Sequence, residues 1–349
     1  MLYGAVIIGW IAYYNYQPKL LEQYNFTNLT LFLFISQGII MAITPLVAGK
    51  LGDHYRKSAG KRLPIISAGI SFAAIIFIAV AFTLIIDPGE TFRWIIPILV
   101  VLWLASMALF TSPAISTIEL FAPADKLPKA MAILTIIYGL IYAVEPIIID
   151  LVDFLGAPLT FVTGGVLVSV SGFILKKNTT DVTDTIIEEK TSRSQLKSDY
   201  SYSLFLGVAF GIITTVLFNM FPGWIEGKIG ECIHGGLVVS VILGVAAMLS
   251  LPISSVVEGK PLYFAVLLGT LVCFLIIFGV YYFENPVIVV VLLLVFAVFY
   301  SVSSVSMLPL ALSVINHKNK VFGVGVFYCE FEIPNGILEA FLVAEFGSL

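Results

Sequence analysis

Residues 262–283 read LYFAVLLGTLVCFLIIFGVYYF, an apolar run without a single charged side chain. A run of this length is about what an α-helix needs to cross the hydrocarbon core of a bilayer. Similar runs recur along the chain, and 59% of its 349 residues are hydrophobic while 11% are charged. Because soluble domains carry roughly 25% charged residues, the sequence predicts a single α-helical body embedded in a membrane.

About eleven apolar windows mark the expected helices. They cover residues 1–17, 29–51, 64–86, 93–120, 129–150, 158–175, 203–223, 233–253, 262–283, 287–312 and 321–342. The polar stretch 176–202 lacks apolar periodicity and predicts a linker between two bundles. We expect an N-terminal six-helix bundle at 1–175 and a C-terminal bundle of about five helices at 203–349. A missing twelfth helix, a shortened sequence and a true eleven-span protein remain open alternatives.

The basic residues are distributed unevenly between the two predicted membrane faces. One face holds only Lys19, Arg93 and Lys228 of the 18 Lys and Arg residues. Because basic residues near helix ends are retained in the cytoplasm, the other face is predicted to be cytoplasmic. This places the N-terminus and the 176–202 linker inside the cell, in a multi-pass protein of the plasma (inner) membrane.

Several classes of function lack their sequence signals. The net charge is −4, and no basic stripe with interleaved aromatics indicates a nucleic-acid partner. No G-x-x-x-x-G-K-[ST] phosphate loop occurs, which argues against an ATP-driven pump. The histidines, His54, His234 and His317, are scattered in loops. We therefore predict neither an enzyme nor a metal site, and no cofactor.

The loop after the second predicted helix, residues 45–66, reads PLVAGKLGDHYRKSAGKRLPII. Its glycines let two helix ends approach, and Asp53 can accept hydrogen bonds at a helix terminus. The candidate signature residues, in order, are Gly49, Asp53, Gly60, Lys61, Arg62 and Pro64. This order resembles the signature loop of the major facilitator superfamily, in the longer form of the glycoside-cation symporters and sucrose-type sugar transporters. The resemblance implies that all of these residues except Pro64 help to hold the two halves together on the cytoplasmic side. A generic basic loop is the alternative.

Two further stretches resemble sugar transporters of the same group. Residues 110–134, FTSPAISTIELFAPADKLPKAMAIL, are similar to the segment of helices 4 and 5, and residues 306–336 to that of helices 10 and 11. The first stretch departs from the family at three positions where charges are usual, Thr111, Leu120 and Leu127; Glu119 is a candidate substitute for the acid. The resemblance implies an all-α major facilitator fold of two helical bundles with a central solute site.

Two carboxylates in apolar segments are candidate coupling groups. A charge at membrane depth costs about 2.5–3.5 kcal/mol on insertion scales, so each is a functional candidate. Glu330 is expected near the middle of the last predicted helix, and Glu145 precedes Pro146 inside the predicted helix 129–150. A proton carrier needs such a group, and a structural carboxyl bonded between helices is the alternative.

Aromatic and amide side chains provide a candidate solute site. Aromatic rings suit the apolar faces of a sugar and amides suit its hydroxyl groups. The candidate residues are Trp10, Tyr14, Gln37, Tyr328 and Asn335. An aromatic belt at the membrane interface is the alternative for the residues near the end of the first helix.

Together these patterns predict a secondary active transporter of a small solute, preferentially a sugar, that works by alternating access. Proton symport is left open, and the expected partners are the solute, protons and the lipid bilayer, with a monomeric protein. A transporter-like sensor or an exporter of apolar compounds is the alternative.

Overall fold

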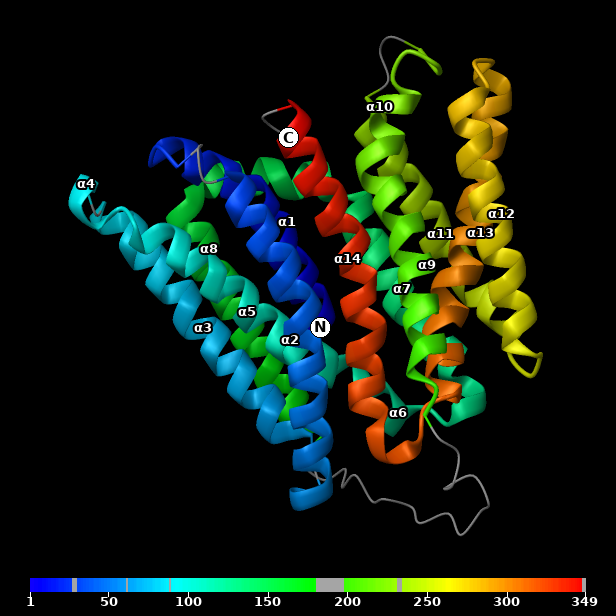
Figure 1. Cartoon of the computed structure of the whole chain (residues 1–349), viewed down its shortest axis with the longest axis horizontal. Coiled ribbons are helices and arrows are strands. Elements are labelled where there is room, and N and C mark those ends of the chain that lie inside the picture. Colours follow the sequence, from blue (N-terminus) through cyan, green and yellow to red (C-terminus); the bar gives the residue numbers. More distant parts are fainter. Residues whose placement is uncertain (27–29, 61, 88, 180–197, 231–233, 347–349) are drawn as a thin grey trace. The chain divides into compact units, whose positions relative to one another are not determined.

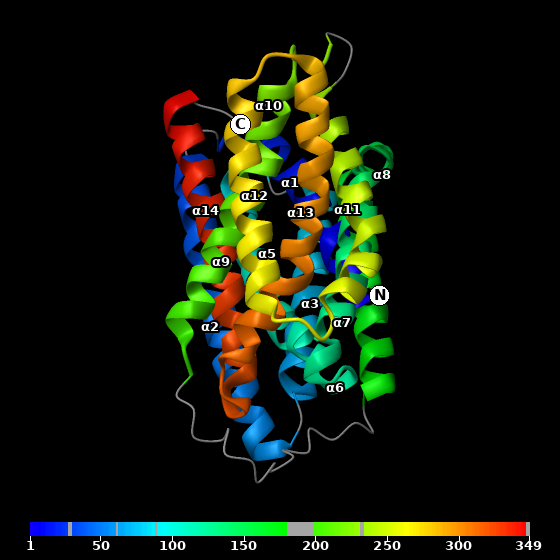
Figure 2. The ribbon, with the colours of Figure 1, turned by 90° about the vertical axis from the view of Figure 1, so that its right-hand side faces the viewer.

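The computed structural model describes residues 1–26, 30–60, 62–87, 89–179, 198–230 and 234–346. Within these ranges every regular element is a helix and no strand occurs (Figures 1 and 2). The predicted all-α class is confirmed. Of the predicted linker 176–202, residues 180–197 lie outside the described part of the chain.

Within the described ranges, long helices cover most of each predicted window. These are α1 (Leu2–Gln23), α2 (Thr30–Ala59), α3 (Leu63–Ile86), α5 (Ile95–Ser116), α7 (Leu127–Ala143), α8 (Glu145–Thr179), α9 (Tyr200–Thr215), α11 (Gly235–Val257), α12 (Leu262–Tyr282), α13 (Pro286–Ser313) and α14 (Lys320–Phe346). Short pieces join them: α4 (Gly89–Phe92), α6 (Ile118–Phe121), η2 (Ala124–Lys126), the π-helix η4 (Val216–Met220), α10 (Phe221–Ile225) and η5 (His317–Asn319). Over the described ranges, nine helices are long and apolar enough to cross a membrane.

The helices form two compact units. Unit 1 comprises residues 1–120, 147–198 and 316–349, and unit 2 comprises residues 121–146 and 199–315. Unit 1 thus combines α14 with early helices, and unit 2 combines α7 with later ones. Each unit therefore contains segments that are distant from one another in the sequence. The division into bundles at 1–175 and 203–349 stays a prediction.

Each unit has its own apolar core. In unit 1 the fully buried side chains of Trp103, Met107 and Phe110 run along α5. In unit 2 Phe221 and Phe296 pack together, with ring centroids 5.1 Å apart. Many large apolar side chains on the outer faces of both units are exposed, as expected for helices that face lipid.

The structure corrects the predicted helix 129–150. It is divided, because α7 ends at Ala143 and α8 begins at Glu145. Glu145 therefore opens α8 instead of lying inside the preceding helix. The one residue between them, Val144, has φ −106° and ψ 13°, and its N–H reaches the carbonyls of Leu140 and Ile141.

A second break lies within α8, at Gly156. Its φ of 74° is a left-handed conformation that glycine adopts without steric cost. The break releases the carbonyl of Val152 from the helical ladder. The hydroxyls of Tyr16 and Thr160 donate to that oxygen, at 2.7 and 3.2 Å, so it stays satisfied in an apolar environment. The helix predicted at 158–175 is the part of α8 beyond this break.

Candidate functional site

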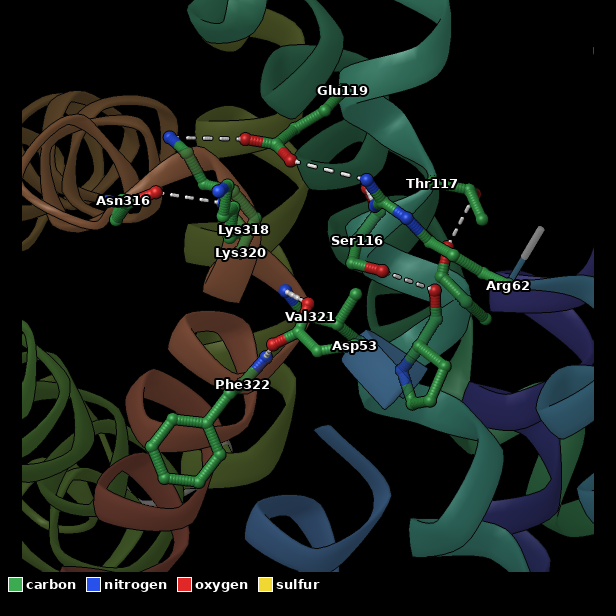
Figure 3. Close-up of polar contacts among 12 residues, drawn as sticks. Asp53, Arg62, Ser116, Thr117, Glu119, Asn316, Lys318, Lys320, Val321 and Phe322 are labelled. Atoms are coloured by element: carbon green, nitrogen blue, oxygen red, sulfur yellow. Dashed lines mark hydrogen bonds and ion pairs between the residues drawn. The ribbon is translucent and has the colours of Figure 1, made fainter. Parts of the chain in front are cut away.

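The predicted signature loop meets the start of α14 within unit 1 (Figure 3). The buried carboxylate of Asp53, near the end of α2, accepts the backbone N–H groups of Val321 at 3.2 Å and Phe322 at 2.9 Å. The first N–H groups of a helix have no partner within the helix. A carboxylate there also interacts favourably with the positive end of the helix dipole. Asp53 is therefore a cap for α14, supplied by a helix that lies 268 residues earlier.

Glycines make this approach of α2 and α14 possible. A Cβ on Gly49 would lie 2.8 Å from the carbonyl oxygen of Val321, and one on Gly325 would lie 2.3 Å from that of Pro45. Gly52 is equally restricted, since its Cβ would be 2.6 Å from a methyl carbon of Val321. A side chain at Gly49 or Gly325 would push the two backbones apart, and one at Gly52 would displace the side chain of Val321.

A small charge network lies beside the cap (Figure 3). Glu119 lies in α6. One of its carboxylate oxygens is 3.6 Å from the guanidinium of Arg62, and the other is 3.3 Å from the ammonium of Lys320. Arg62 is 2% exposed and also donates to the carbonyl of Ser116. A buried charge without such partners is costly, so Glu119 helps to stabilise the buried guanidinium of Arg62.

The candidate signature residues thus have separate roles. Gly49, Asp53 and Arg62 form the contact region, while Gly60, with φ 63°, ends α2 in the left-handed conformation typical of a helix C-terminus. Pro64 lies in the first turn of α3, where its missing N–H costs nothing. Lys61 lies outside the described residues. Lys320 was missed by the sequence analysis because nothing local links it to Glu119.

Three candidate solute-binding residues come together in unit 1. Gln37 is 3% exposed and accepts a hydrogen bond from the Tyr13 hydroxyl at 3.1 Å; its amide nitrogen reaches the Tyr14 hydroxyl at 3.5 Å. Trp10 contacts the rings of both tyrosines. Trp103 of α5 completes the cluster, stacked on Tyr13 with an interplanar angle of 5° and ring centroids 4.6 Å apart. Trp103 is not among the residues that the sequence predicts for this site.

The other two candidates lie on α14. Tyr328 and Asn335 are both half-buried. A Cβ on Gly38 would lie 3.6 Å from the Cα of Gly336, so the backbone next to Asn335 passes close to the backbone next to Gln37. Asn335 is thereby at the level of the Gln37 cluster, and Tyr328 is two turns closer to the Asp53 cap.

Of the two candidate coupling carboxylates, only Glu145 has a side chain that the structure describes. The side chain of Glu330 lies outside the described residues. Glu145 is half-buried at the start of α8, and no hydrogen bond or ion pair joins its carboxylate to another described residue. Within the described ranges, no three His, Cys, Asp or Glu side chains gather in a way that could hold a metal ion.

The sequence profile of the family described as Major Facilitator Superfamily matches residues 1–330. A search of curated proteins finds no match. Solved structures of similar fold include the human organic anion transporter MFSD10 (TETRAN), with 10% identity, a TM-score of 0.67 and coverage of 98% of this chain and 92% of that chain.

Two further solved structures resemble the chain over nearly its whole length. One is the proton:xylose symporter XylE bound to 6-bromo-6-deoxy-D-glucose, with 11% identity, a TM-score of 0.64 and coverage of 99% of this chain and 94% of that chain. The other is the transporter FucP in the outward conformation, with 12% identity, a TM-score of 0.61 and coverage of 99% and 92%. Identities this low show a shared fold only.

Proposed function

This chain belongs to the major facilitator superfamily, and we propose that it carries a small hydroxylated solute, such as a sugar, across the membrane by alternating access. Family membership confirms the predicted fold and makes the protein an integral membrane transporter and not an enzyme. We place it in the glycoside-cation symporter and sucrose-type group on the strength of residues 45–66, 110–134 and 306–336.

The cluster around Gln37 carries the proposal of a sugar. It combines aromatic surfaces, from Trp10 and Tyr14, with an amide held in place by the Tyr13 hydroxyl. Aromatic faces bind the C–H faces of a sugar ring, and an amide can both donate to and accept from hydroxyl groups. Tyr328 and Asn335 on α14 would contribute further polar contacts.

The contact between α2 and α14 supports alternating access. It is made of capping hydrogen bonds from Asp53, with glycines in place of interlocking side chains. Beside it, Glu119 of α6 pairs with Arg62 and with Lys320 of α14. Polar contacts of this kind can be exchanged for water at a small net cost. We propose that the signature loop, Lys61 included, holds the transporter in one of its access states on the cytoplasmic side, with the N-terminus and linker on the same side.

Glu330 and Glu145 are the proposed sites of proton coupling. For Glu145 the support is its lack of any described partner, because a carboxylate without a cation or donor nearby is free to exchange a proton with the solvent. We further propose that the protein acts as a monomer in the plasma (inner) membrane.

Uptake into proteoliposomes tests the proposal. Purified protein is reconstituted and offered radiolabelled sucrose, maltose or glucose, with and without an inward proton gradient. We expect uptake of at least one sugar, faster with the gradient. Gln37→Ala should raise the KM about tenfold, which is the effect of losing one buried polar contact. The control is Gln23→Ala, at an exposed position in the last turn of α1, which should leave the KM unchanged.

Three results would overturn this function. Absence of binding and uptake for all three sugars by folded protein would exclude a transporter of these sugars. Binding without uptake would indicate a sensor. Uptake that Gln37→Ala leaves unchanged would remove the proposed solute site.

A further inference from the structure

α8 is too long to be a single membrane span. Its 35 residues would extend about 52 Å as one straight helix, whereas the hydrocarbon core of a bilayer is about 30 Å thick. The part after the break at Gly156, residues 157–179, extends about 34 Å and is sufficient to cross that core. Residues 147–155, which belong to unit 1 together with this span, are therefore not needed to cross the membrane.

The span begins level with the end of α3. Gly165 and Gly172 of α8 lie against Phe77 and Ile70 of α3, because a Cβ at either glycine would be 2.9 or 2.6 Å from those side chains. The residue numbers rise in one helix as they fall in the other, so the two helices are antiparallel. Continuing this register brings residue 157 beside the last turn of α3, which ends at Ile86. Residues 147–155 consequently lie at the membrane surface of unit 1.

The chain turns sharply at the break instead of continuing outward. Val152 and Thr160 would be about 12 Å apart along the axis of a straight helix, yet the Thr160 hydroxyl donates to the Val152 carbonyl at 3.2 Å. The Tyr16 hydroxyl donates to the same carbonyl, and the neighbouring Asp153 pairs with Lys19 at 2.8 Å. Residues 147–155 are thereby held against the end of α1, at the level where the span begins.

One side of this segment is apolar and uncovered. Its side chains recur at spacings of four and three residues, which places them on one stripe of a helix. They are Ile147, Leu151 and Phe154, which are 68%, 56% and 86% exposed. Phe154 is more exposed than any other large apolar side chain that the structure describes. A stripe of this kind beside polar groups is typical of a membrane or protein interaction surface.

The other sides of the segment are a buried face and an acidic edge. Val152 is 5% exposed and belongs to the core of unit 1. Asp150 and Asp153 are exposed, and Asp150 lies only about 40° around the helix from Phe154 at 100° per residue. A helix with adjacent apolar and charged edges suits the plane of the membrane interface. Within the hydrocarbon core, by contrast, Asp150 would contact lipid tails at high cost.

We propose that residues 147–155 form an interfacial helix that binds the surface of the lipid bilayer. Ile147, Leu151 and Phe154 enter the boundary between headgroups and acyl chains, and Asp150 stays among the headgroups. Lipid is the occupant of the stripe because the stripe continues the surface of the span 157–179 at the point where that span enters the bilayer. This contact fixes the depth of α1 and of the span, whatever solute the protein carries.

Spin labels on the full-length protein in lipid vesicles test the proposal. Phe154→Cys, Asp150→Cys and Ile75→Cys are each made in a chain whose three native cysteines are replaced by alanine. Collisions of the label with oxygen, which concentrates in lipid, are compared with collisions with a water-soluble nickel chelate. At position 154 we expect oxygen to be favoured several-fold, at a depth of about 5–10 Å. At position 150 the chelate should be favoured several-fold.

Ile75 is the matched control for depth. It is 62% exposed near the middle of α3, in the same unit, so its label should lie deeper than the label at position 154. The unfolding temperature shows whether the cysteine-free chain is folded. If that chain does not fold, Phe154→Trp and Asp150→Trp in the native sequence give the same comparison. Brominated lipids should then quench the added fluorescence of the first variant several-fold more than that of the second.

Three results would overturn the proposal. Equal access of the chelate to positions 154 and 150 would place the stripe in water. Protection of position 154 from both reagents would mean that a protein surface covers it. A label at position 154 as deep as the label at Ile75 would make the segment part of a membrane span.

Discussion

The cap on α14 leads to a quantitative prediction about Asp53. Replacing it with alanine removes both oxygens that accept the N–H groups of Val321 and Phe322. Asparagine keeps the shape and one acceptor oxygen but loses the negative charge at the positive end of the helix. We therefore expect Asp53→Ala to destabilise the protein more than Asp53→Asn does.

The magnitudes follow from the burial of the two N–H groups. Val321 is fully buried, so its N–H cannot turn to water and costs about 1–3 kcal/mol when left unpaired. Phe322 is half-buried, so its N–H can recover part of the loss, and we assign it about 1 kcal/mol. The two N–H groups sum to about 2–4 kcal/mol for Asp53→Ala, and the charge lost near the helix dipole adds about 1 kcal/mol. Asp53→Asn loses the same charge and one of the two acceptor oxygens, so with the Phe322 N–H unpaired we expect about 2 kcal/mol.

The assay is reversible denaturant unfolding of the purified protein in detergent. Asp125→Asn, at an exposed position, is the control and should change the free energy of unfolding by less than about 0.5 kcal/mol. Equal destabilisation by the alanine and asparagine variants would refute the capping argument, as would an alanine variant that behaves like the control.

Three further predictions concern contacts in unit 1. Gly325→Ala should lower the free energy of unfolding by about 1–3 kcal/mol, since its Cβ would lie 2.3 Å from a backbone oxygen of α2. The control is Gly223→Ala, whose Cβ would meet open space and which should leave the free energy of unfolding unchanged. Similar unfolding curves for both variants would contradict the close packing. Glu119→Gln should cost about 3 kcal/mol by the same assay because buried Arg62 loses its charged partner, and an unchanged midpoint would mean that the ion pair contributes nothing. Tyr16→Phe should cost about 1 kcal/mol and speed hydrogen exchange around the α8 break, whose free carbonyl loses one of its two donors; exchange unaltered there would show that the hydroxyl does not support the break.

Much of the fold could be read from local sequence. Length and hydrophobicity decide whether a segment crosses a bilayer, because a buried backbone in lipid must satisfy its own hydrogen bonds and so becomes helical. The windows at 262–283 and 64–86, for example, agree with α12 and α3 to within one residue. The predicted helix boundaries were wrong where a single residue interrupts the helix within an apolar run, as Val144 does between α7 and α8.

The candidate site could be predicted only in part. Asp53 and Arg62 were selected from their order within one loop, and Trp10 and Gln37 from their residue type at an expected membrane depth. The stacking of Trp103 on Tyr13 could not be predicted, because nothing in the residues around a tryptophan in an apolar segment indicates which distant ring it contacts.

The sequence by itself therefore determined the helices, their membrane character and the family, since these depend on properties of neighbouring residues. Only the tertiary structure decided which distant groups meet: Asp53 with the start of α14, Glu119 with Arg62 and Lys320, and Phe218 with the tyrosines of α7. Such pairs depend on how helices pack, and packing follows from the combined shape of many side chains, which no local pattern encodes.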